Sequence, residues 1–115
     1  MEIKNEIIRE SFEKLNSLKD QEFSYFEFVN IVNTILTEIH RLMMSSDNEE
    51  DKKEYYDTHA AITHALTKEV KEIEYKEIEM KKNNAAQIRW DEHDNLVTEA
   101  YETIHADITK IIHLL

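Results

Sequence analysis

The 115-residue sequence contains neither glycine nor proline. A domain of this length would ordinarily have about eight glycines and about six prolines. Glycine relieves left-handed backbone and proline enforces sharp stops, so helix ends in this chain must be set by side-chain caps and by Asn. The same absence excludes Gly-rich phosphate loops, dinucleotide fingerprints and nucleophile elbows, because each needs glycine at fixed positions.

Apolar residues at helical spacing predict an all-α fold, an antiparallel bundle of about four helices that forms a single domain over residues 1–115. The expected helices cover about residues 2–18, 24–44, 47–82 and 85–115. The second is apolar around nearly its whole circumference, which is typical of a buried central helix.

Helix starts are marked by capping boxes. Ser24 with Glu27, and Ser46 with Glu49, have the spacing at which a hydroxyl and a carboxylate satisfy two backbone N–H groups at a helix start. Phe23 and Phe28 stand where a hydrophobic staple would join the incoming chain to the first turn. We therefore expect the second and third helices to begin at Ser24 and Ser46.

The third expected helix has one ambiguous stretch. The letters E-I-E-Y-K-E-I-E-M-K partly alternate, as in a strand, but the pairs Glu72–Lys76 and Glu77–Lys81 at i,i+4 favour a continuous helix. A turn at residues 83–84, both Asn, would follow.

The expected helices differ in length. The third and fourth would span roughly 54 and 46 Å, against roughly 33 Å for the second. Residues 70–95 should then project as a hairpin tip, by roughly 20 Å. We predict a partner-binding surface there, composed of Tyr75, Ile78, Met80, Ile88, Trp90, Asp91, Glu92 and Asp94. The alternative is that the apolar members only join the two arms of the hairpin.

Charge and composition restrict the partners. The 25 acidic residues outnumber the 14 basic ones and give a net charge of −11, spread along the chain. This disfavours nucleic acid and could direct the protein to a basic partner, although charge alone favours the simpler interpretation of a solvated acidic surface. No apolar run approaches a membrane span and the first residues are charged, so we expect a cytoplasmic chain without membrane contact. Without cysteine there is no disulfide or thiol chemistry.

Metal and catalytic patterns are incomplete. His59 and His93 fall on apolar helix stripes, but about 22 Å apart in the expected hairpin, too far to share an ion. Glu102-x-x-His105 has the form of a di-iron bundle element, but the sequence has no second copy and Glu102 should face solvent. We expect no metal site and no cofactor.

Three carboxylates, Glu50, Glu54 and Asp57, share a predicted helix face. Their spacing partly resembles that of all-α nucleotide pyrophosphohydrolases, whose motif is E-E-x-x-E followed by E-x-x-D. Only Glu54-x-x-Asp57 matches, and the three point away from the predicted core face. We make no family assignment on this basis.

The expected function is that of a small, acidic, non-catalytic protein-binding module. Inhibitors of the immunity-protein type, from bacteria or phages, often have this size and charge, which is an analogy of class only. The first alternative is a homodimeric structural or adaptor bundle. The second, less favoured, is an all-α hydrolase with a carboxylate-bound metal.

Overall fold

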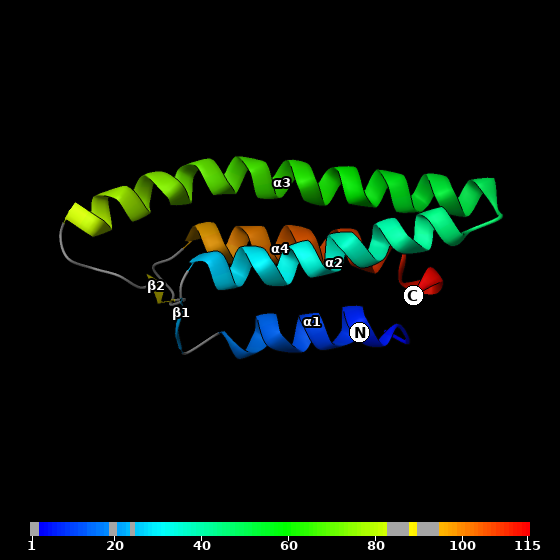
Figure 1. The fold of residues 1–115 in the computed structure, drawn as a ribbon, viewed down its shortest axis with the longest axis horizontal. Helices are drawn as coiled ribbons and strands as arrows, with labels where there is room; N and C mark the ends of the chain where they lie inside the picture. Colours follow the sequence, from blue (N-terminus) through cyan, green and yellow to red (C-terminus); the bar gives the residue numbers. More distant parts are fainter. Residues whose placement is uncertain (1–2, 19–20, 24, 83–87, 90–94) are drawn as a thin grey trace.

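A computed structural model describes residues 3–18, 21–23, 25–82, 88–89 and 95–115. Four α-helices make up most of these residues, followed by a short 3-10 turn, η1. They are α1 (Glu6–Ser17), α2 (Tyr25–Ser45), α3 (Glu49–Lys82) and α4 (Asn95–Lys110), with η1 at Ile112–Leu114. The bundle is elongated, 51 × 24 × 19 Å, with α2 between α1 and α3, and α3 also packed on α4 (Figure 1). The predicted all-α bundle of four helices is confirmed.

One hydrophobic core joins the four helices, and α2 contributes to it over most of its length, as its apolar sequence predicts. The largest fully buried side chains in the described residues come from every helix and from the segment before α2. They are Phe23, Phe28, Ile8, Leu15, Ile35, Ile39, Ile62, Ile104, Ile108 and Val32.

The start of α1 is fixed by Asn5, rather than near residue 2 as expected. Its Oδ1 accepts the N–H of Ile8 at 3.0 Å, and its Nδ2 donates to Glu38 Oε1 on α2 at 3.1 Å. The backbone N–H of Asn5 also donates to the carbonyl of Leu115. Arg41 donates to the same Glu38, and these hydrogen bonds lower the pKa of that carboxyl although burial opposes the shift. A polar junction thus joins α1, α2 and the last residue.

The cap of α3 is Asn48, and the predicted capping box of Ser46 with Glu49 is wrong. Asn48 Oδ1 accepts the N–H groups of Glu50 at 2.9 Å and Asp51 at 3.2 Å. The Ser46 hydroxyl accepts only the N–H of Asn48, at 3.3 Å. Asn is as good an N-cap as Ser, so the helix starts two residues later than the box suggested. Ser24, the other predicted cap, lies outside the described residues.

A two-residue antiparallel ladder pairs β1 (Glu22–Phe23) with β2 (Ile88–Arg89), placing Phe23 opposite Ile88. The fourth helix accordingly begins at Asn95 and ends at Lys110, not at 85 and 115 as predicted. The physical reason is the pairing with Phe23: Ile88 stands in a stretch without a helical apolar stripe, and a β-branched residue favours extended backbone when it is paired. The regular stripe begins only after Asn95.

The third helix is continuous through the alternating stretch, so the prediction of helix over strand is confirmed. It runs antiparallel to α2, with the rings of His40 and His59 6.2 Å apart between them. Because the two helices are antiparallel and these histidines are level, Tyr25, fifteen residues before His40 and the first residue of α2, is level with residue 74, fifteen residues after His59. Residues 75–82 therefore extend about 12 Å past the start of α2, and they are named the projecting segment from here on. Figure 1 shows α3 passing the starts of both α2 and α4.

Candidate functional site

The predicted partner-binding residues are distributed over two elements and one undescribed stretch. Residues 75, 78 and 80 (Tyr, Ile and Met) belong to the projecting segment, whose backbone the structure describes. Ile88 lies in β2, at the end of the bundle from which α3 projects, and not on a helix alongside α3. The other four, Trp90, Asp91, Glu92 and Asp94, lie outside the described residues. The sequence predicted a helical arm facing α3 at residue 88, and the structure has a strand there instead.

The projecting segment, together with the five residues before it, differs in charge from the rest of the protein. Residues 70–82 contain four acids and four lysines, so this stretch is neutral within a chain of net charge −11. Between the charges stand Ile73, Tyr75, Ile78 and Met80, residue types that favour protein interfaces when exposed. No described residue of α2 is level with residues 75–82.

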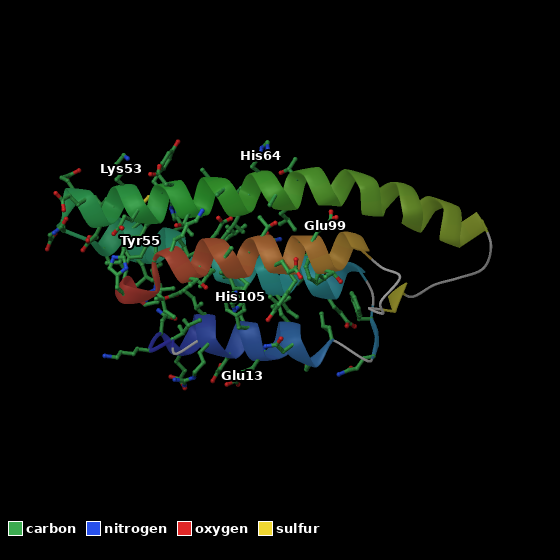
Figure 2. The ribbon with its side chains drawn as sticks, turned by 180° about the vertical axis from the view of Figure 1, so that it is seen from behind. Glu13, Lys53, Tyr55, His64, Glu99 and His105 are labelled. Carbon is green, nitrogen blue, oxygen red and sulfur yellow. The ribbon has the colours of Figure 1, made fainter. Side chains whose placement is uncertain are left out.

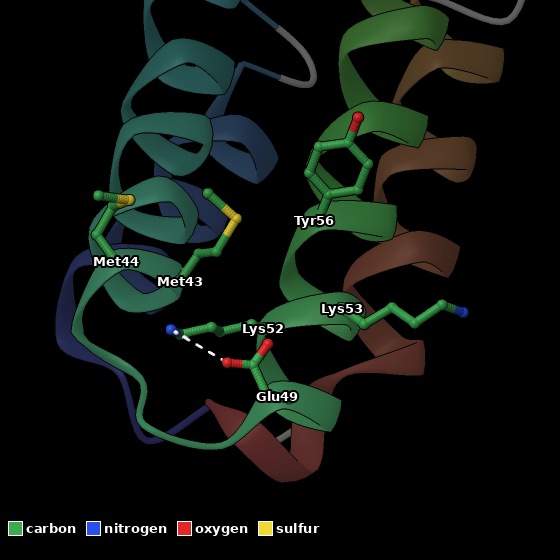
Figure 3. A pocket seen from close by; sticks show the side chains of 6 residues that line it. All are labelled: Met43, Met44, Glu49, Lys52, Lys53 and Tyr56. Atoms are coloured by element: carbon green, nitrogen blue, oxygen red, sulfur yellow. Dashed lines mark ion pairs between the residues drawn. The ribbon is translucent and has the colours of Figure 1, made fainter.

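A second candidate surface lies at the opposite end of α3, where α2 turns into it. A pocket of about 380 Å3, open to solvent, is lined there by Met43, Met44, Glu49, Lys52, Lys53 and Tyr56. The apolar members, Met43, Met44 and Tyr56, are named the turn-end patch below. Figure 3 shows the two methionines on α2 and the tyrosine on α3 around one opening, with Lys53 pointing away.

Exposure sets the turn-end patch apart. Met44 is 70% and Tyr56 62% exposed, and among the residues whose side chains the structure describes, which do not include residues 68–97, the other exposed large apolar side chain is Ile7, at 43%. Met43 is half-buried and packs on the core, so apolar surface is continuous from the core to the pocket. Isolated exposed apolar residues are ordinary, but two beside a pocket form a recognisable surface.

The surroundings of the turn-end patch are acidic. Residues 43–60 contain six acids and two lysines. Lys52 pairs with Glu49 at 3.7 Å, and Lys53 with Asp57 at 3.5 Å, both on their own helix. Both lysines are therefore matched by carboxylates, and the exposed acids at the start of α3, Asp47, Glu49 and Glu50, are named the acidic rim below.

Two histidines lie one turn from this patch, between α2 and α3. His40 is exposed and His59 half-buried. Partial burial, and secondly the nearness of His40, lower the pKa of His59. His59 thus packs between two helices, and His93, the other histidine on a predicted apolar stripe, lies outside the described residues.

A cleft of about 300 Å3 separates α1 from α4 on another face. Tyr101 donates a hydrogen bond from its hydroxyl to Asn16 Oδ1 at 2.8 Å, and the rings of Phe12 and His105 pack edge to face, 6.1 Å apart. Figure 2 labels His105 on α4 and Glu13 on α1, the two helices that line the cleft. These contacts join the helices through aromatic packing, and Glu102, the partner of His105 in the di-iron-like pattern, is exposed.

The three carboxylates compared with pyrophosphohydrolases do not converge on one point. Glu54 Oε2 lies 3.2 Å from His113 Nε2 in η1, whereas Asp57 pairs with Lys53 and Glu50 is exposed. In the part of the chain that the structure describes, no group of three or more acidic or histidine side chains could hold a metal ion.

The turn-end patch was missed in the sequence, although a signal for it exists. Met43-Met44 and Tyr55-Tyr56 are adjacent apolar pairs on helices. Neighbouring helical residues point about 100° apart, so only one of each pair can face the core fully. The structure buries Tyr55, whose hydroxyl donates to the Leu114 carbonyl at 3.2 Å, and leaves Tyr56 in solvent.

Comparison of the chain with protein-family models finds no match, and neither does comparison with curated proteins or with solved structures. Among the described helices, none has both the length and the apolar character that crossing a membrane requires. Functional inference therefore depends on the geometry of the surfaces above.

Proposed function

We propose that this protein is a non-catalytic protein-binding module whose partner contacts the projecting segment of α3. The observation that supports this most is the continuation of α3 past the start of α2, which leaves residues 75–82 without a level neighbour on that helix. Residues 70–82 are electrically neutral and include Tyr75, Ile78 and Met80. A partner helix or sheet laid against them would bury apolar surface without desolvating an excess of one charge.

The finer proposal is an inhibitor or immunity-type role. A rigid bundle with net charge −11 would approach a basic protein quickly, because complementary charge accelerates encounter. Residues 70–82, which are neutral overall and include the projecting segment, would then supply the close contacts, and the acidic bundle would occlude the basic surface. Neither the charge attraction nor the close contacts require a catalytic group.

Site-specific photo-crosslinking tests the proposal. A photoreactive phenylalanine analogue is placed at Tyr75 or Ile78 on the projecting segment and, as a matched control on the same helix, at the exposed His64. The proposal expects a heterologous product in cells from positions 75 and 78 and none from position 64. Circular dichroism and thermal melts of all three variants confirm that the fold is retained.

The products separate the alternatives. A crosslinked species of twice the chain mass, with a light-scattering mass that rises with concentration, would identify the homodimeric scaffold. Equal crosslinking from positions 64 and 75, or none from positions 75 and 78, would refute the projecting segment as the binding surface.

A further inference from the structure

We propose that the turn-end patch is a separate docking site for a basic amphipathic helix of a partner protein. The pocket at the α2–α3 turn would receive one bulky apolar side chain of that helix, and the acidic rim would pair with its lysines or arginines. This inference does not depend on the projecting segment, which lies at the other end of α3.

The pocket favours a protein segment over a small molecule. Its volume of about 380 Å3 is at the small end of ligand pockets. Such pockets usually enclose 70–90% or more of a ligand's surface, whereas this one is open to solvent on one side. A helix can instead insert one side chain and lay the rest of its apolar face across Met44 and Tyr56.

The residue types suit a helical partner. Methionine is unbranched and flexible, so Met43 and Met44 can adjust to different apolar anchors at little strain. Tyr56 offers a large ring, 62% exposed, on the facing helix. Because Met43 packs on the core, the floor of the pocket is held in place while Met44 stays free to adjust.

Charge complementarity selects the class of partner. With six acids against two lysines over residues 43–60, a cationic helix gains attraction at the rim. Glu49 lines the pocket itself and is 88% exposed at its side chain, and Asp47 and Glu50, which are close to Glu49 in the sequence, are exposed. An acidic helix would be repelled. A second copy of this chain would bring two acidic rims together, so self-association at this patch is disfavoured.

The first experiment measures binding of a fluorescein-labelled synthetic peptide of about 14 residues, with Leu at i, i+3, i+4 and i+7 and Lys elsewhere, by fluorescence anisotropy. Two control peptides keep one feature each: one replaces every Lys with Glu, and the other replaces every Leu with Ser. We expect binding of the Lys/Leu peptide, no binding of the Glu/Leu peptide, and binding of the Lys/Ser peptide that is weaker by about tenfold or more. Equal binding of the Lys/Ser peptide would mean simple charge attraction and would overturn the proposal.

Variants then locate the site. The double substitution Met44→Ser, Tyr56→Ser should weaken binding by about tenfold or more, because truncating central apolar contacts has the largest effects in interfaces. Ile7→Ser, which removes the exposed isoleucine of α1, is the matched control and should bind as the unmodified chain does. Glu49→Gln should weaken binding less, and the loss should shrink in high salt. Unchanged affinity in the double variant would overturn the proposal.

Amide chemical-shift mapping distinguishes this inference from the proposed function. Shifts confined to residues 43–57 support the turn-end patch even if crosslinking from positions 75 and 78 fails. Shifts confined to residues 70–82 would assign the peptide to the projecting segment and overturn the docking site at the turn, while leaving the proposed function in place.

Discussion

The two halves of α3 are one continuous helix held by different forces. In the first half, Tyr55, Thr58, Ile62 and Leu66 are buried at helical spacing against α2 and α4. The last eight residues extend past the start of α2, and their sequence alternates apolar residues with Glu and Lys. Packing stabilises the first half, whereas local helix propensity and i,i+4 charge pairs must sustain the last eight residues.

This difference determines how strongly a substitution at each end of α3 should destabilise the domain. Most helical stability in proteins comes from burying an apolar face, so a packed residue affects the whole domain. A projecting turn opens on its own, because its loss breaks few tertiary contacts. The same substitution should therefore have a global effect in one half of α3 and a local effect in the other.

The largest expected effect is Ile62→Ala in the packed half. Ile62 is fully buried, so truncation leaves a cavity and should lower the free energy of unfolding by about 2–5 kcal/mol. The matched substitution Ile78→Ala in the projecting segment should change it by less than about 1 kcal/mol, partly because Ala is the better helix former. Urea denaturation measures both. Equal losses would show that residue 78 is packed as tightly as residue 62.

The helix caps come next in size. Asn5→Ala removes the cap of α1 and the hydrogen bond to buried Glu38, and should cost roughly 1–2 kcal/mol of unfolding free energy. Asn48→Ala, at the exposed cap of α3, should cost about 0.5–1 kcal/mol. Ser46→Ala is the control and should cost almost nothing. A larger loss from Ser46→Ala than from Asn48→Ala would restore the capping box expected from the sequence.

These caps illustrate what the sequence could predict. Helix type and number follow from apolar residues at helical spacing, which are regular in α1, in the first part of α3 and in α4. Helix starts are harder to predict, because several Ser and Asn residues can stand within one turn and any of them can cap the helix. The choice of Asn5 depends on Glu38, 33 residues away, and such a contact is invisible to local spacing.

The candidate surfaces show the same limit. The extension of α3 past α2 followed from helix lengths, although the predicted overhang began near residue 70 and the observed one near 75. The strand at Ile88 could not be predicted, because a two-residue ladder is specified by its partner, Phe23, rather than by its own pattern. The pairs Met43-Met44 and Tyr55-Tyr56 indicated that one member of each would be exposed, but which one depended on the placement of the facing helix.

A smaller, pH-dependent effect is expected in the packed half. Burial and His40 lower the pKa of His59 below its usual value of 6.5, so the folded chain holds this proton less tightly than the unfolded chain does. The contribution of His59 to the free energy of unfolding is complete above pH 6.5, and it declines as pH falls from there through the lower folded-state pKa of His59. His59→Gln should flatten the decline of the urea midpoint between pH 7 and 5. An unchanged slope would mean that His59 is solvated in the folded chain.

The His59 measurement needs separation from Glu38, whose lowered pKa also weakens the fold in acid. Its contribution is present above the ordinary carboxyl value of 4.5 and is lost only as pH falls below that. The two windows differ, so His59→Gln should leave the decline below pH 4.5 intact. Loss of both declines in one variant would indicate a general change of the fold.

The smallest expected effects contrast two charge pairs on α3. Lys53→Gln breaks the Lys53–Asp57 pair in the packed half, and Lys76→Gln, in the projecting segment, removes the lysine that stands at i,i+4 from Glu72. Each should cost about 0.2–0.5 kcal/mol at low salt, since Gln and Lys have similar helix propensity. The loss from Lys53→Gln should appear in the urea midpoint of the whole domain. The loss from Lys76→Gln should appear only as faster amide hydrogen exchange in residues 73–82.

Salt provides the control for this pair of variants, because both differences should vanish near 1 M salt, where the screening length is about 3 Å. A shift of the urea midpoint by Lys76→Gln equal to that of Lys53→Gln would contradict the comparison between the halves. The projecting segment would then unfold together with the packed half, and a helix that opens only with the domain must be held by contacts along its whole length. Such contacts would leave less apolar surface at residues 75–82 for a partner, so this small effect bears directly on the proposed binding surface.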